Sequence, residues 1–290
     1  GMTRLGWKSR PETVHELQAA AAVGQMGLIQ AYEEVFSTFR IPTAQILLDH
    51  DDFSNRKRYL NARSTLKTLL SLGVVPIVNE NDTVAANELK VGDNDNLGAY
   101  TALVAQADTL IICSDIDGLF TADPRKDNTA TLIPHVGKID STIYGLAGGA
   151  GTAVGTGGMR TKIEAADKCT SSGIQTLIVN GRKGETFDAP LEGEVPGTLF
   201  EASRTPANAR RLWLTHTLKT AGRIEEDSGA KEALIQKGAS LLPSGIIDVV
   251  GQFEQGDAVE VICQGAVVAK GLCLYNAKDL GLIKGKKSKD

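Results

Sequence analysis

The apolar and polar residues follow two different patterns along the chain. Up to about residue 180, short apolar runs alternate with longer segments in which apolar residues recur every three or four positions. These patterns predict strands and amphipathic helices respectively. The predicted strands are residues 44–48, 74–78, 110–113 and 174–180, and the predicted helices are residues 12–39, 55–72, 96–106 and about 158–172. Regular alternation of this kind predicts an α/β fold, with a parallel sheet covered by helices on both faces.

The C-terminal part of the chain has a different pattern. Residues 201–211 are polar and aperiodic, which predicts a linker. Short apolar runs with turn residues between them follow, and they predict strands at 246–250, 258–262 and 266–274. Such a series is typical of a small β-barrel or roll. A chain of 290 residues is long enough for two domains, and we place them at residues 1–205 and 206–290.

A dense group of carboxylates and amides follows the predicted strand 74–78. The sequence there reads N-E-N-D (79–82) and then V-G-D-N-D-N-L (91–97). Ligand crevices of open α/β sheets lie at the carboxyl ends of strands. Asp82, Asp93 and Asp95 are close along the chain and repel one another, so a metal, a lysine or a substrate ammonium is expected among them. A solvated acidic loop is the alternative.

A glycine-rich segment precedes the helix predicted at 158–172. Residues 155–162 read G-T-G-G-M-R-T-K. Glycines let the backbone close around an anion, and a helix N-terminus presents free N–H groups. Lys162, one turn into the helix, can place an ammonium beside a phosphate. The glycine spacing fits neither a Walker A loop nor a dinucleotide fingerprint, and a plain surface loop is the alternative.

A second polar turn follows the strand predicted at 110–113. Ser114 and Asp115 come first, and the dipeptides Asp117-Gly118 and Asp123-Pro124 follow. Together they are candidates for the base and ribose pocket of a nucleotide, although dipeptides of this kind are common in ordinary turns. We recognise no Ser/His or Cys/His pattern that indicates a nucleophile.

Composition narrows the classes of partner. The formal charge is −4, and from residue 212 onward ten basic residues balance ten acidic ones, so RNA binding is not favoured. The four cysteines form no C-x-x-C pair and have no histidines at zinc spacing, which suits reduced thiols of an intracellular protein and no zinc site. No signal peptide or membrane-spanning apolar run is recognised, so we expect a cytoplasmic protein without membrane contacts.

Taken together, these motifs resemble the glutamate 5-kinases, a branch of the amino-acid kinase family. The resemblance rests on I-V-N-E-N-D, V-G-D-N-D-N-L, S-D-I-D-G-L-F-T-A-D-P-R and G-T-G-G-M-R-T-K, which occur here in the family's order and spacing. Beyond the linker, G-A-S-L-L-P-S-G-I and F-E-Q-G-D-A-V-E-V resemble the PUA domain that bacterial members append. The resemblance covers essentially the whole chain.

The resemblance implies an amino-acid-kinase αβα sandwich with a mainly parallel central sheet, followed by a small barrel-like PUA domain. It implies ATP-dependent phosphorylation of the L-glutamate γ-carboxylate to glutamyl 5-phosphate, the first step of proline biosynthesis. ATP and Mg²⁺ would take part, the protein would be a homo-oligomer, and proline would be a feedback inhibitor. The alternatives are an RNA-binding protein and an inactive assembly remnant.

The resemblance also assigns roles by position. Asp82 and Asn94 would hold glutamate, Asp95 would orient the catalytic lysines, and Lys162 would neutralise the transferring phosphoryl group. The nucleotide contacts would be Ser114, Asp115 and the backbone of Thr156, Gly157, Gly158, Met159, Arg160, Thr161 and Lys162. The family opens with a strand and a K-x-G-(T/S)-S loop, and its PUA barrel has a last strand. We expect both to be missing from residues 1–290, together with a lysine and a serine that share the catalytic work.

Overall fold

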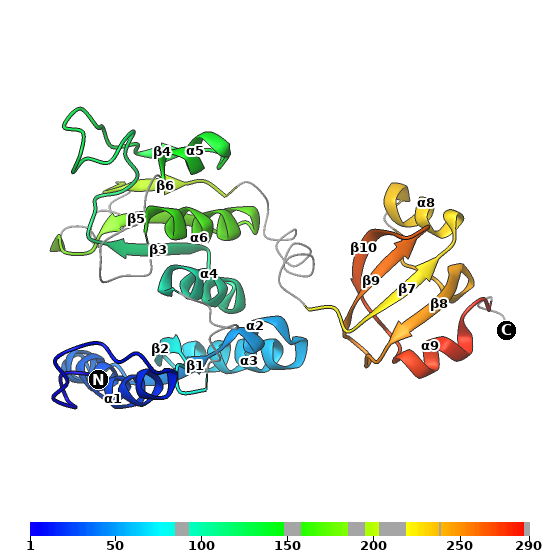
Figure 1. Cartoon of the computed structure of the whole chain (residues 1–290), viewed down its shortest axis with the longest axis horizontal. Helices are drawn as coiled ribbons and strands as arrows, with labels where there is room; N and C mark the ends of the chain where they lie inside the picture. The colour runs from blue at the N-terminus through cyan, green and yellow to red at the C-terminus, as the bar shows by residue number, and fades with distance from the viewer. Residues whose placement is uncertain (85–92, 148–157, 185–194, 203–218, 238, 287–290) are drawn as a thin grey trace. The chain divides into compact units, whose positions relative to one another are not determined.

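We describe the protein from a computed structural model. It describes residues 1–84, 93–147, 158–184, 195–202, 219–237 and 239–286. The chain divides into two compact units, one of residues 1–52 and 59–209 and the other of residues 53–58 and 210–290 (Figure 1). Most of the predicted linker and the domain boundary at 205/206 lie outside the described residues, so that boundary stays a prediction.

Residues 14–80 follow the predicted alternation, with one additional short helix at residues 50–54 that was not predicted. The elements are α1 (Val14–Thr38), β1 (Thr43–Leu48), α2 (His50–Ser54), α3 (Arg56–Ser71) and β2 (Val75–Glu80). Helix α1 begins where the Thr13 hydroxyl accepts a hydrogen bond from the Glu16 amide, at 3.3 Å. Helix α3 is followed by Gly73 at φ +72°, a left-handed conformation that favours glycine. Strands β1 and β2 are paired in parallel, and their carboxyl ends lie together.

The second half of unit 1 contains a four-stranded sheet. Its elements are α4 (Asn94–Ala105), β3 (Thr109–Ser114), β4 (His135–Val136), α5 (Ser141–Leu146), α6 (Met159–Ser171), β5 (Gln175–Asn180) and β6 (Thr198–Phe200). The strand order is β3-β5-β6-β4, in which β3 and β5 are parallel and β6 is antiparallel to β5. Strands β4 and β6 and helix α5 were not predicted, because so few residues show no periodicity. The described strands therefore form two sheets in unit 1, with α4 and α6 packed beside them.

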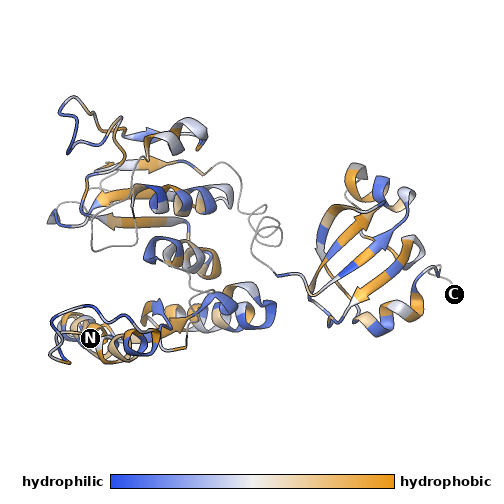
Figure 2. Ribbon diagram, viewed as in Figure 1, coloured by the Kyte–Doolittle hydropathy of each residue, from blue (hydrophilic) through white to orange (hydrophobic). Residues whose placement is uncertain are grey.

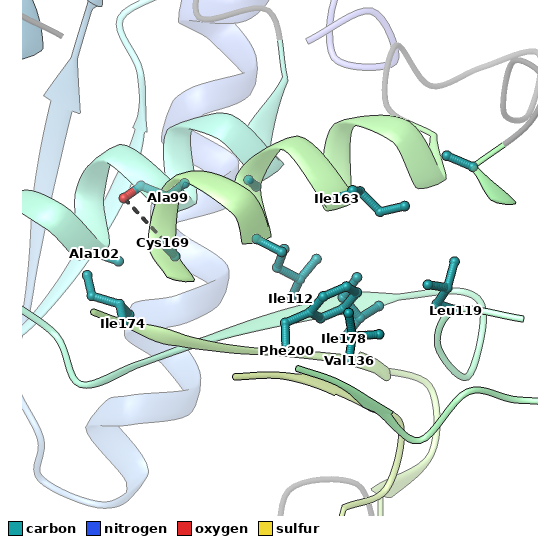
Figure 3. Packing of buried hydrophobic residues seen from close by; sticks show 13 residues of the cluster. Ala99, Ala102, Ile112, Leu119, Val136, Ile163, Cys169, Ile174, Ile178 and Phe200 are labelled. Atoms are coloured by element: carbon teal, nitrogen blue, oxygen red, sulfur yellow. Dashed lines mark hydrogen bonds between the residues drawn. The ribbon is translucent and has the colours of Figure 1, made fainter. Parts of the chain in front are cut away.

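The core of unit 1 lies between helix α6 and the four-stranded sheet. Ile163, Ile178 and Phe200 are fully buried and meet between α6 and the sheet (Figure 3). Each such side chain contributes about 1.5–3 kcal/mol through burial. Small residues let α6 approach α4: the Cys169 thiol donates to the Ala99 carbonyl at 3.9 Å. Helix α6 thereby packs against both α4 and the sheet.

Unit 2 is built on a second sheet. Its elements are β7 (Gly222–Glu226), α8 (Ser228–Lys237), the 3₁₀ turn η4 (Pro243–Gly245), β8 (Ile246–Gly251), β9 (Ala258–Cys263), β10 (Ala266–Leu272) and α9 (Ala277–Ile283). The order is β10-β9-β7-β8, antiparallel except for the parallel pair β7 and β9. Predicted strands 246–250, 258–262 and 266–274 are confirmed as β8, β9 and β10. Strand β7 and both helices were missed.

The hydropathy of the chain follows these elements. Apolar residues concentrate in β3 and β5 of unit 1 and in β8, β9 and β10 of unit 2 (Figure 2). The core of unit 2 includes Ile224, Phe253, Val259 and Leu280. A search of the described helices finds none that is both long and apolar enough to cross a membrane.

Candidate functional site

A cavity of about 380 Å³ lies where strand β3 ends and helix α6 begins. Ser114 is paired with Asn180 in the register of β3 and β5, so the carboxyl ends of two parallel strands meet there. That is the edge at which α/β sheets bind ligands. The lining residues are Ser114, Asp115, Ile116, Asp117, Phe120, Pro124, Arg125, Gly158, Met159, Lys162 and Asn180. The sequence-predicted Ser114, Asp115 and Lys162 therefore share one cavity.

Asp117 closes one side of this cavity. Its Oδ1 accepts hydrogen bonds from Lys183 Nζ at 2.7 Å and from Asn180 Nδ2 at 2.8 Å. These two bonds, that from Lys183 first, hold the pKa of the Asp117 carboxyl below its ordinary value. The turn after β3 is thus tied to the end of β5. Sequence reasoning missed Asn180 and Lys183, although the end of a neighbouring parallel strand was the place to look for them.

The other side of the cavity is the N-terminus of α6. The Gly158 amide donates to the Thr161 hydroxyl at 3.1 Å, and Met159 and Lys162 line the cavity. Free N–H groups and the positive end of the helix dipole favour an anion such as a phosphate here. Arg160 instead forms an ion pair with Glu164 at 3.0 Å, and its side chain is 73% exposed. The predicted nucleotide contacts Thr156 and Gly157 lie outside the described residues.

Lys162 joins this cavity to helix α4. Its Nζ lies 2.9 Å from Asp95 Oδ2, and the Thr161 hydroxyl lies 2.7 Å from the same oxygen. The side chains of Lys162 and Asp95 are only 15% and 14% exposed. A paired, shielded lysine keeps one position instead of sampling many rotamers. The expectation that a cation would stand among the carboxylates of residues 79–97 is met by Lys162, whereas the catalytic roles of Lys162 and Asp95 stay predictions.

The predicted glutamate contacts, Asp82 and Asn94, are not part of the cavity lining. Asp82 is partly buried in the turn after β2, and Asn94 is the exposed first residue of α4. Residues 85–92 between them are not described. Asn94 directly precedes Asp95, the partner of Lys162. Behind the strand end, Asn79 Nδ2 donates to Gln25 Oε1 of α1 at 2.8 Å, a contact that the sequence did not indicate.

Comparison with known proteins agrees with this geometry. The model of the amino acid kinase family matches residues 2–180, and that of the PUA domain matches residues 222–290. The chain is 51% identical to a glutamate 5-kinase of Bordetella petrii over 96% of its own length and 74% of that protein's. It is 52% identical to a glutamate 5-kinase of Azoarcus sp. over 96% and 75%. It is 48% identical to a glutamate 5-kinase of Idiomarina loihiensis over 100% and 78% of the two lengths. The chain therefore belongs to the amino acid kinase family and, within it, to the glutamate 5-kinases.

Proposed function

We propose that this protein transfers the γ-phosphoryl group of ATP to the γ-carboxylate of L-glutamate, forming glutamyl 5-phosphate and ADP in the first step of proline biosynthesis. The observation that carries the proposal is the position of Lys162. Its ammonium is paired with Asp95 at 2.9 Å and at the same time lines a cavity at a helix N-terminus. The family to which the chain belongs supports the choice of glutamate.

The reaction needs charge and alignment more than proton transfer. A glutamate γ-carboxylate is already ionised at neutral pH, so it attacks the γ-phosphorus without a general base. One carboxylate O–P bond forms while the bond to the β,γ-bridging oxygen breaks, and ADP keeps that electron pair. Negative charge spreads over the transferring oxygens. Lys162 and the amides at the start of α6 would stabilise that charge.

The other predicted residues would bind and orient the two substrates. Ser114, Asp115 and the backbone of residues 156–162 would bind ATP, and Asp82 and Asn94 would bind glutamate. Mg²⁺ would enter with ATP, because this ion is usually held by phosphates, waters and one or two carboxylates. Asp115 at the cavity wall is a carboxylate of the right kind, acting directly or through water.

The proposal also includes the location, assembly and regulation that the family resemblance implies. The protein would act in the cytoplasm as a homo-oligomer, with proline as a feedback inhibitor. The PUA-like unit has no basic excess and would bind RNA weakly.

The test is an ATP-dependent hydroxamate assay with L-glutamate, L-aspartate and N-acetylglutamate as acceptors. It should be run on residues 1–290, with the Bordetella petrii protein as the positive control. We expect glutamate-dependent turnover. Turnover with aspartate or acetylglutamate but none with glutamate would overturn the proposal.

A further inference from the structure

The first turn of helix α4 is held by a cap on one side. Asp93 is the N-cap residue: its Oδ1 accepts from the Asn96 amide at 2.8 Å, and its Oδ2 accepts from the Asn96 side-chain amide at 2.8 Å. Asn94 and Asp95 lie between these two residues. Any movement of the cap therefore moves Asn94, the proposed glutamate contact, whereas Asp95 is also held by Lys162 and Thr161.

A second lysine of α6 reaches this cap. Lys168 Nζ donates to Asn96 Oδ1 at 2.6 Å, and Asn96 is only 8% exposed. The same ammonium lies 5.8 Å from the ring centroid of Tyr100, one turn further along α4. A cation over an aromatic ring is attracted to it. Asn96 therefore links Lys168 to Asp93 through one shared side-chain amide.

Helix geometry explains why residues on one face of α6 contact two neighbouring residues in the first turn of α4. Thr161 and Lys168 are seven residues apart, which is about two helical turns, so they project from nearly the same side. Thr161 contacts Asp95 and Lys168 contacts Asn96. Fully buried Ala165 lies between them on that face and permits the close approach of α4. The exposed Asn94 thus belongs to a turn that is fixed from two sides.

The charges around this turn also support a role for Lys168. Asp93 and Asp95 flank Asn94, and each of these carboxylates interacts with one lysine of α6. Lys162 pairs with Asp95 directly, while Lys168 acts on Asp93 through the Asn96 amide. Lys168 is not among the residues that line the cavity, as far as the structure describes them. Removing Lys168 should therefore weaken the binding of glutamate and leave the binding of the nucleotide unchanged.

We propose that Lys168 is a positioning residue for glutamate binding: it locks the capped first turn of α4 so that Asn94 is held where the substrate meets it. This inference rests on the proposed function. Lys168 itself would touch neither substrate. It would act through Asn96 and Asp93.

The kinetic test compares Lys168→Met with Lys67→Met, which removes an exposed lysine of α3 by the same substitution. We expect Lys168→Met to raise the KM for glutamate about three- to tenfold, less than the loss of a hydrogen bond between a charged group and the substrate itself, because Lys168 acts only through Asn96 and Asp93. The kcat and the KM for ATP should stay within about twofold. Lys168→Arg, which keeps the cation, should recover part of the loss. An unchanged glutamate KM, or a loss of kcat that only follows a lower Tm, would overturn the inference.

A second measurement separates this inference from the proposed function. Hydrogen–deuterium exchange needs no turnover, and it reports the amides of Asn96 and Leu97, which donate to Asp93. We expect Lys168→Met to speed exchange in the peptide that spans this turn and to leave β3 and β5 unchanged. Absence of glutamate turnover in the unaltered protein would sink the proposed function alone. Unaltered exchange in Lys168→Met would sink the role of Lys168.

Discussion

Two shielded carboxylates, one in each unit, have opposite surroundings. Asp95 in unit 1 is 14% exposed, and one of its oxygens has both the Lys162 ammonium and the Thr161 hydroxyl as partners. Glu226 in unit 2 is 1% exposed, and neither of its carboxylate oxygens has a hydrogen-bond partner in the described part of the chain. A buried charge destabilises a fold unless it is paired. Asp95 is therefore a paired charge, whereas the charge of Glu226 destabilises the fold.

Glu226 also makes the stability of the fold depend on pH. Burial raises the pKa of the Glu226 carboxyl above its ordinary value of 4.5, and the nearby Asp227 raises it further. The folded state then binds the proton more tightly than the unfolded state. The resulting stability is fully present below the unfolded pKa and is lost as pH rises through the folded pKa. At neutral pH, Glu226 is a penalty, whereas the charge of Asp95 is offset by Lys162.

The largest effect is expected when the partner of Asp95 is removed. Lys162→Met keeps the length and the helix propensity of the side chain but removes its ammonium. If that charge stabilises the transition state, as proposed, kcat should fall about a hundredfold or more, equivalent to about 3 kcal/mol. The KM for glutamate should hardly change. Steady-state kinetics measures both, with Lys67→Met as the matched control. A rise in the glutamate KM alone would show that Lys162 belongs to a different sub-site.

A smaller effect, of a different kind, is expected at Asp82. If this carboxylate pairs with the substrate's α-ammonium, the contact exists before and during transfer, so its loss weakens binding without slowing the chemistry. Asp82→Asn should raise the glutamate KM about tenfold or more, the range for a charge-assisted hydrogen bond. The kcat and the KM for ATP should be nearly unchanged. An increase confined to the KM for ATP would place Asp82 on the nucleotide side instead.

Replacement of Glu226, the unpaired carboxylate, should improve the protein's stability, whereas replacement of Lys162 or Asp82 should impair its activity. Glu226→Met replaces it with an apolar side chain of similar volume, which should raise the free energy of unfolding at pH 7 by about 1–3 kcal/mol. Urea titrations between pH 4 and pH 8 should show the gain growing with pH, since the penalty in the unaltered chain appears as Glu226 ionises. Glu226→Gln should remove the same pH dependence.

The exposed neighbour Glu225 provides the control for this experiment. Glu225→Met changes the same charge on the same strand without relieving a buried group, so its effect should be small and independent of pH over this range. A loss of stability in Glu226→Met would mean that the carboxylate has a partner in the folded protein.

The smallest effect is expected at the second partner of Asp95. Thr161→Val removes one neutral hydroxyl and keeps the shape of the side chain. Losing such a hydrogen bond is worth about 0.5–1.5 kcal/mol, so kcat should fall about two- to tenfold. The Gly158 amide also loses its acceptor, and the KM for ATP should therefore rise modestly. A loss as large as that of Lys162→Met would show that Thr161 does more than orient Asp95.

Much of the fold was predictable from periodicity. The strands around residues 44–48, 74–78, 110–113 and 174–180 and the helices between them appear within a few residues of their predicted ends. Helices such as α4 and α6 bury several residues of one face, and that burial leaves a repeating pattern. Strands β4 and β6, with two and three residues, leave none. The antiparallel direction of β6 against β5 also depends on chain connections that a local pattern does not record.

The amino-acid sequence by itself determined the family and the kinds of side chain at the site: carboxylates and amides after a strand, and glycines followed by a lysine at a helix start. Only the tertiary structure decided which of them meet. Lys162 and Asp95 are 67 residues apart along the chain, Lys168 and Asn96 are 72, and Asn180 and Asp117 are 63. The lack of a described partner for Glu226 was equally invisible. Local sequence encodes which face of an element is apolar, whereas pairing across elements follows from strand order and helix packing, which are properties of the whole core.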